Sequence, residues 1–162
     1  MKTAAILLIV LVLAVGGCIG YALFNTSLQV IGKGLQVFPA QERPVEFETL
    51  RMAVEQKSLV GTVLQPGNLG PSSDYSYYMY TLRIKNPGLV DAEMVELQIA
   101  PISQDVLFYG DLAEIIIPAG ETRDIWCVLL TRGEPHAVRD IYITYYVWGH
   151  PQEVKFTYDN TI

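Results

Sequence analysis

The chain has 162 residues, of which 51% are hydrophobic, and it carries a formal net charge of −6 at pH 7. This acidic balance argues against nucleic acid as a partner, because phosphate binding needs clustered Lys and Arg, and the basic residues here are scattered among acids. Without its apolar N-terminal segment the chain has the size of one domain with one hydrophobic core, which argues against an active site between two lobes.

The N-terminus carries a membrane-spanning pattern. Residues 4–24, AAILLIVLVLAVGGCIGYALF, contain no charged side chain. A helix of this length rises about 1.5 Å per residue and covers roughly 30 Å, the thickness of the hydrocarbon core of a bilayer. We therefore expect residues 1–24 to form a transmembrane signal anchor, with the membrane as a partner. Lys2 favours a cytoplasmic N-terminus, which places the rest of this single-pass protein outside the cytoplasm.

Two alternatives to a retained anchor stay open. Val15-Gly16-Gly17-Cys18 resembles the lipobox of bacterial lipoproteins, and this resemblance implies lipidation of Cys18, which becomes the mature N-terminus. The other alternative is cleavage and release of the domain. Cys127 lies in an apolar stretch and cannot easily meet Cys18, so we expect it to be a small buried side chain rather than half of a disulfide.

The next two segments are less regular. Residues 25–44 contain several Gly and Pro and only short apolar fragments, which predicts a stalk with at most one edge strand. In residues 46–57, Phe47, Leu50 and Val54 fit one face of a helix, whereas Leu50, Met52 and Val54 alternate as in a strand. We expect a strand, because the sequence that follows is uniformly of β type.

From residue 59 onward, short runs of alternating apolar and polar residues are separated by turns. In the clearest run, Tyr78, Tyr80, Leu82 and Ile84 share one face. Similar runs occupy residues 92–100, 122–131, 140–148 and 154–158. Roughly seven short antiparallel strands at this spacing predict an all-β fold, a single immunoglobulin-like β-sandwich over residues 45–162. An isolated barrel is the alternative.

Two turns carry a resemblance to known families. Asn86-Pro87-Gly88 ends one strand, and Pro118-Ala119-Gly120-Glu121 introduces a later one. This pairing resembles bacterial cell-surface immunoglobulin-like modules of the CARDB and FxLYD kind and, as a second choice, water-stress domains of the late-embryogenesis-abundant type. The resemblance implies a fold and a location, and it implies no reaction.

The sequence offers few groups for catalysis or metal binding. Its two histidines, His136 and His150, lie in turns and stand at no metal-ligand spacing. The carboxylates at strand ends form no calcium-binding loop, and we expect them to be solvated; they are Asp74, Asp91, Asp105, Asp111 and Glu114. We therefore expect no metal, no cofactor and no enzymatic activity, with a small envelope enzyme as an alternative.

Aromatic residues provide the candidate binding face. Tyr77, Tyr142, Tyr146 and Trp148 fall on the outward positions of their strands. Exposed aromatic rings in a row serve sugar stacking or protein contact, although a second layer could cover them instead. We expect a membrane-anchored, extracytoplasmic, non-catalytic interaction or structural module of the cell envelope, whose partner is another envelope protein or a glycan. A lipoprotein with a carbohydrate-binding aromatic face is the alternative.

Overall fold

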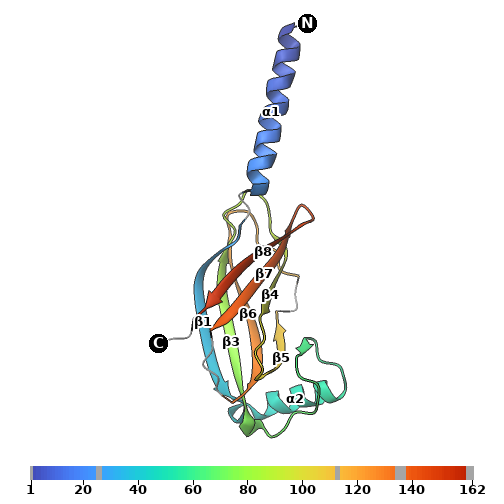
Figure 1. Cartoon of the computed structure of the whole chain (residues 1–162), viewed down its shortest axis with the longest axis vertical. Coiled ribbons are helices and arrows are strands. Elements are labelled where there is room, and N and C mark those ends of the chain that lie inside the picture. Colours follow the sequence, from blue (N-terminus) through green and yellow to red (C-terminus); the bar gives the residue numbers. More distant parts are fainter. Residues whose placement is uncertain (1, 25–26, 112–113, 134–137, 160–162) are drawn as a thin grey trace.

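The computed structural model describes residues 2–24, 27–111, 114–133 and 138–159. Its first element, α1 (Lys2–Phe24), is a helix that projects from one end of a two-layered β structure (Figure 1). Residues Thr3–Tyr21 are long and apolar enough to cross a membrane and are not buried against the rest of the chain. Among the described residues α1 is thus a candidate membrane anchor, in the segment where the sequence places one.

The strands form two antiparallel sheets packed face to face. The larger sheet has the order β1-β3-β6-β5-β2, and the smaller has the order β4-β7-β8. The strands are β1 (Gln29–Pro39), β2 (Thr62–Val63), β3 (Tyr75–Lys85), β4 (Glu93–Ile99), β5 (Asp105–Gly110), β6 (Thr122–Arg132), β7 (Arg139–Val147) and β8 (His150–Tyr158). Apart from β2, this is the strand order of constant-type immunoglobulin domains. The predicted all-β antiparallel sandwich behind one N-terminal apolar helix is confirmed.

The main core lies between the sheets and follows the predicted alternation. Tyr78, Tyr80, Leu82 and Ile84 of β3 are at most 4% exposed. The facing sheet buries Val95, Leu97, Ile99, Ile141, Ile143, Tyr145 and Val147. Because successive side chains of a strand point to opposite faces, this period of two is sufficient to place one row of each strand in the core.

β1 occupies the segment that was expected to be a stalk. It pairs antiparallel with β3, from Gln29 opposite Lys85 to Pro39 opposite Ser76. Gly32 allows the close approach, since a Cβ there would lie 3.1 Å from the Cβ of Arg83. Residues 29–39 are therefore an edge strand of the sandwich, which begins at β1 rather than at residue 45.

α2 (Pro44–Glu55) is a helix in the segment for which we expected a strand. Pro44 stands in its first turn, where a missing N–H removes no intrahelical hydrogen bond. Phe47 is buried, and Leu50 and Val54 pack against the same cluster. The period of 3.6 residues describes this segment, and the strand prediction is wrong.

A second apolar cluster lies beneath α2 on the outer face of the larger sheet. Its buried members are Ala40, Phe47, Leu69, Tyr75, Tyr77, Val106, Leu107, Val128 and Leu130. The rings of Phe47 and Tyr75 lie 5.5 Å apart between centroids. The short 3-10 helices η1 (Ala40–Glu42) and η2 (Ser72–Asp74) flank this cluster. The larger sheet is therefore buried on both faces near α2.

The end of the sandwich from which α1 emerges is here called the helix-proximal end. It contains the turns at residues 86–91, 118–121 and 148–149 (Figure 1). Asn86 joins the first two: its side-chain amide donates to the carbonyls of Val90 and Ile117, at 2.8 and 2.9 Å. Its backbone accepts from Gly120 and donates to Glu121. The two turns that carry the family resemblance thus meet in space.

The opposite end is crossed by a buried ion pair between the sheets. Arg139 at the start of β7 donates to both carboxylate oxygens of Asp105 on β5, at 2.7 and 2.9 Å. Thr131 and the backbone N–H of Ile102 also donate to this carboxylate. Both charged side chains are at most 1% exposed. The expectation that Asp105 is solvated at a strand end is therefore wrong.

Candidate functional site

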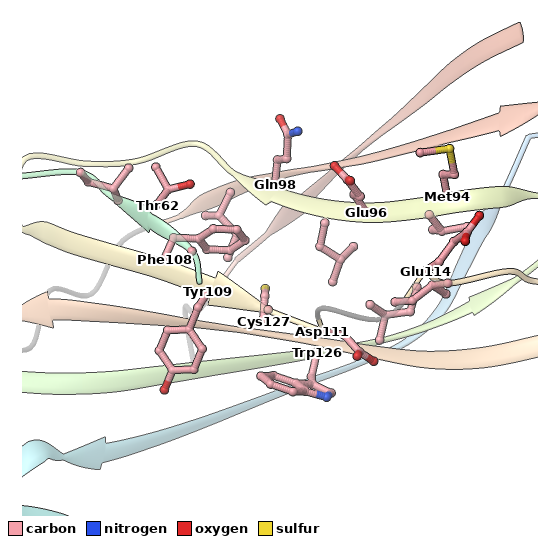
Figure 2. Close-up of a pocket in the computed structure, with 18 residues that line it drawn as sticks. Thr62, Met94, Glu96, Gln98, Phe108, Tyr109, Asp111, Glu114, Trp126 and Cys127 are labelled. Atoms are coloured by element: carbon pink, nitrogen blue, oxygen red, sulfur yellow. The ribbon is translucent and has the colours of Figure 1, made fainter. Parts of the chain in front are cut away.

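A cleft of about 720 Å³ opens on one side of the sandwich, where the edges of the two sheets face each other. β4 is the edge strand of the smaller sheet on this side, and β2 is the edge strand of the larger sheet. Residues of β2, β4, β5 and β6 line the cleft (Figure 2). At one end of this side, Ala92 and Val95 form backbone hydrogen bonds with Ile117 and Ile115. Beyond Val95, β4 pairs only with β7 in the described part of the chain, so the space between the sheet edges is open there.

The floor of the cleft is apolar. β4 contributes Val95, Leu97 and Ile99, and β6 contributes Ile125 and Cys127. Cys127 points into the space between the sheets, whereas its neighbour Trp126 points to the other side of β6 (Figure 2). The strand alternation that builds the core therefore also builds this floor.

The rim of the cleft carries negative charge. Glu96, Asp111 and Glu114 line it, and the described lining contains no Lys, Arg or His. Figure 2 shows Glu96 and Gln98 on β4 with their side chains pointing away from the space between the sheets, and Asp111 on the opposite side of the cleft. Low-dielectric walls beside charges of one sign focus the field, so the cleft favours a cationic ligand over an anionic one.

One glycine shapes the rim at β2. Gly61 precedes β2, and a Cβ there would lie 2.5 Å from the carbonyl oxygen of Phe108. Any larger residue would push β2 away from β5, because a side-chain carbon does not fit at that distance. Thr62 and Val63 then pair with Phe108 and Leu107. This close approach sets the position of the cleft wall.

The thiol of Cys127 in the floor of the cleft is not activated as a nucleophile. Burial raises the pKa of Cys127 from 9.0 to about 12. The thiol is therefore protonated near neutral pH, and the thiolate is the nucleophilic form. Burial also raises the pKa of Tyr109, with Glu46 contributing in the same direction.

The structure does not bring the four predicted aromatic site residues together. Tyr77 is 4% exposed and packs in the cluster beneath α2, so its assignment to an exposed face is corrected. Tyr142 and Tyr146 lie on the outer face of the smaller sheet, where Tyr142 is half-buried and Tyr146 exposed. Trp148 lies in the β7–β8 turn. The platform that combined Tyr77 with the other three is absent because Tyr77 belongs to the other sheet.

The remaining candidates are also separate. Cys18 is exposed on α1 and Cys127 is buried. His150 is exposed at the start of β8, and His136 lies outside the described residues. Within the described part of the chain, no three His, Cys, Asp or Glu residues form a group that could hold a metal ion.

The sequence did not reveal the cleft. Its lining comes from four strands that are distant in sequence, and the strands themselves read as ordinary alternating runs. The local signal was Gly61 before a short strand, since an isolated glycine in a strand pattern often marks close backbone approach. That signal identifies one contact and cannot identify the facing strand.

Comparisons with known proteins give likeness at the level of the fold. No protein-family model matches the chain, and no curated protein sequence matches it. A FixG-related protein from Vibrio parahaemolyticus is similar in structure, with a TM-score of 0.36, 13% identity, and 80% of this chain and 97% of that chain covered. The cupredoxin domain of amoB from Nitrosocaldus yellowstonii has a TM-score of 0.40 at 12% identity, with 82% and 86% covered. At these values the two likenesses carry no inference about function.

Proposed function

We propose that the protein is a membrane-anchored, extracytoplasmic and non-catalytic binding module of the cell envelope. Its binding site is the cleft between the sheet edges, and its ligand is an extended, basic segment of another envelope protein. The observation that carries this proposal is the combination of an apolar floor with a rim of three carboxylates and no cation in the described lining. The resemblance to cell-surface modules, which rests on the turns at Asn86 and Pro118, agrees with this role.

Edge strands support an extended ligand. β2 and the part of β4 that follows Val95 are the sheet edges that flank the cleft, whereas Ala92 and Val95 already bond to Ile117 and Ile115. An edge strand offers backbone N–H and C=O groups to an added strand, while alternate side chains enter pockets beside it. A segment with apolar residues toward the floor and Lys or Arg toward Glu96 and Glu114 satisfies both requirements.

The binding proposal predicts a charge-selective response. We expect a short labelled peptide of alternating Val and Lys to bind the detergent-solubilised full chain, measured by fluorescence anisotropy, and a Val–Glu peptide not to bind. The double change Glu96→Lys and Glu114→Lys should abolish binding of the basic peptide. Glu153→Lys, on β8 away from the cleft, is the matched control and should leave it unchanged. Equal binding of both peptides would contradict the site.

The anchoring proposal is tested separately. Protease added to intact cells should digest the sandwich and leave α1 in the membrane, because the domain lies outside the cytoplasm. Complete protection until the cells are lysed would contradict this orientation. Mass spectrometry of the mature N-terminus then separates the two anchors: Met1 indicates the retained helix, and a diacylated Cys18 indicates the lipoprotein.

A further inference from the structure

The helix-proximal end is held close to the end of α1 by the chain itself. α1 ends at Phe24 and β1 begins at Gln29. Even a fully extended connection of this length covers less than about 20 Å at roughly 3.5 Å per residue. Leu28, at its far end, is buried and donates its N–H to the hydroxyl of Tyr145 at 3.3 Å. Wherever α1 lies, the turns of this end are therefore near it.

Two of these turns present large apolar side chains to solvent. Leu89, in the turn between β3 and β4, is 70% exposed, and Trp148, in the turn between β7 and β8, is 52% exposed. Both turns lie at the end from which α1 emerges (Figure 1). Lys85 and Arg123 lie at the same end as Asp91 and Glu121, so charges of both signs surround them. The acidity of the whole chain is not concentrated here.

Trp148 is an unusual residue for its turn. It has a φ of +50°, and Gly149 after it has a φ of +75°. A two-residue hairpin turn of this kind favours Asn-Gly or Asp-Gly, and a bulky residue at positive φ is uncommon. Turn formation therefore gives no reason for a tryptophan at this position. Trp is enriched at membrane–water interfaces, where its ring contacts the acyl chains and its N–H remains hydrated.

We infer that Leu89 and Trp148 insert into the headgroup region of the bilayer in which the chain is anchored, so that the sandwich docks on the lipid surface. The inference rests on the proposed membrane anchoring. α1 gives the attachment, and the two turns restrict rotation of the domain on it. The cleft is then held to the side of the sandwich, at a fixed height above the lipid, where a neighbouring envelope protein can reach it.

The two tryptophans of the chain provide the test. Trp126 is 38% exposed and lies on the outer face of β6, so it is the internal control. The full chain is reconstituted in phosphatidylcholine vesicles as Trp126→Phe, which retains Trp148, and as Trp148→Phe, which retains Trp126. Lipids brominated near the headgroup then quench any tryptophan at that depth. Thermal melts confirm that both variants remain folded.

We expect brominated lipid to quench Trp148 roughly two-fold or more, because interfacial tryptophans lie at the depth of the label, and to leave Trp126 unchanged. Adding Leu89→Ser to the Trp148-only variant should reduce that quenching. Co-flotation with the vesicles reports the anchor independently. Flotation with Trp148 as unquenched as Trp126 overturns the docking alone, whereas failure to float overturns the anchoring and the docking with it.

Discussion

At the scale of single residues, Asn86 makes hydrogen bonds that join two turns of the helix-proximal end. It is 1% exposed, and its side chain accepts from the N–H of Gly88 while donating to the carbonyl of Val90 in its own turn and to that of Ile117 in another segment. We expect Asn86→Ala to lower the free energy of unfolding by about 3 kcal/mol, because it leaves buried backbone groups without partners. Asn68→Ala, at an exposed loop position, is the control and should change it by less than about 0.5 kcal/mol. Chemical denaturation measures both, and equal effects would contradict this role.

Two Arg–Asp pairs of similar geometry differ in burial. Arg139–Asp105 is buried between the sheets, whereas Arg83–Asp124 joins β3 to β6 on the surface, with both its contacts at 2.7 Å. We expect Asp105→Asn to cost about 3–5 kcal/mol of stability, because Arg139 then stays buried without a counter-charge. Asp124→Asn should cost at most about 1 kcal/mol, because water screens an exposed pair. Urea titration of the two variants measures the difference, and a similar loss in both would contradict the importance of burial.

At the scale of elements, α2 acts as a cover for the outer face of the larger sheet. Phe47 is 1% exposed, whereas Val45 on the same helix is 78% exposed. We expect Phe47→Ala to cost about 3–5 kcal/mol through the cavity it leaves, and Val45→Ala to cost almost nothing. Hydrogen exchange should show faster exchange in α2 for the first variant. Unchanged stability would mean that α2 is not part of the cooperative unit.

The sequence predicts the elements of this fold that repeat with a single clear period. The rows Tyr78 to Ile84 and Ile141 to Val147 are buried as expected, because one period of two was sufficient to orient them. α2 was missed because Leu50 and Val54 satisfy both periods. Residues 25–44 were predicted to be a stalk with at most one edge strand because Gly32, Gly34 and Pro39 resemble a linker, although an edge strand tolerates them. Local composition could not show that β3 lies beside this segment.

The candidate site was less predictable than the fold. The outward position of Tyr77 on β3 was inferred correctly from strand alternation, but α2 covers that face. The sequence left a covering layer open as an alternative, but the pattern did not identify α2 as that layer. The cleft depends on which strand edges face each other, and β4 and β2 are distant in the sequence. Pairing and layering are properties of the assembled chain, so single-strand patterns could not supply them.

At the scale of the whole molecule, the two ends of the sandwich differ in kind. The helix-proximal end combines exposed Leu89 and Trp148 with the Asn86 hydrogen bonds, whereas the opposite end buries charge between the sheets. The cleft lies on the side between these ends, where it is accessible whether or not the helix-proximal end contacts lipid. The proposed ligand binding therefore uses a surface separate from the proposed anchoring and docking and can be tested independently of them.

The whole domain should lose stability in alkali. Burial raises the pKa of Cys127 and of Tyr80 to about 12, from 9.0 and 10.0, and Arg139 opposes the effect at Tyr80 only in part. The unfolded chain therefore releases these protons at lower pH than the folded chain does. The stabilising contribution is fully present below pH 9 and declines as the pH rises towards 12, by about 1.4 kcal/mol per pH unit for each group in its range.

Urea denaturation of the full chain at intervals between pH 8 and pH 12 measures this decline. Cys127→Ala should be less stable at pH 8, because it leaves a small cavity, and should then lose less on going to pH 12 than the unaltered chain does. Tyr80→Phe should flatten the same part of the curve above pH 10. Tyr146→Phe, at an exposed position, is the matched control and should follow the unaltered chain. Parallel curves for all four proteins would show that the buried thiol and phenol do not set the alkaline limit, whereas flattening in the first two variants alone assigns that limit to the core between the sheets.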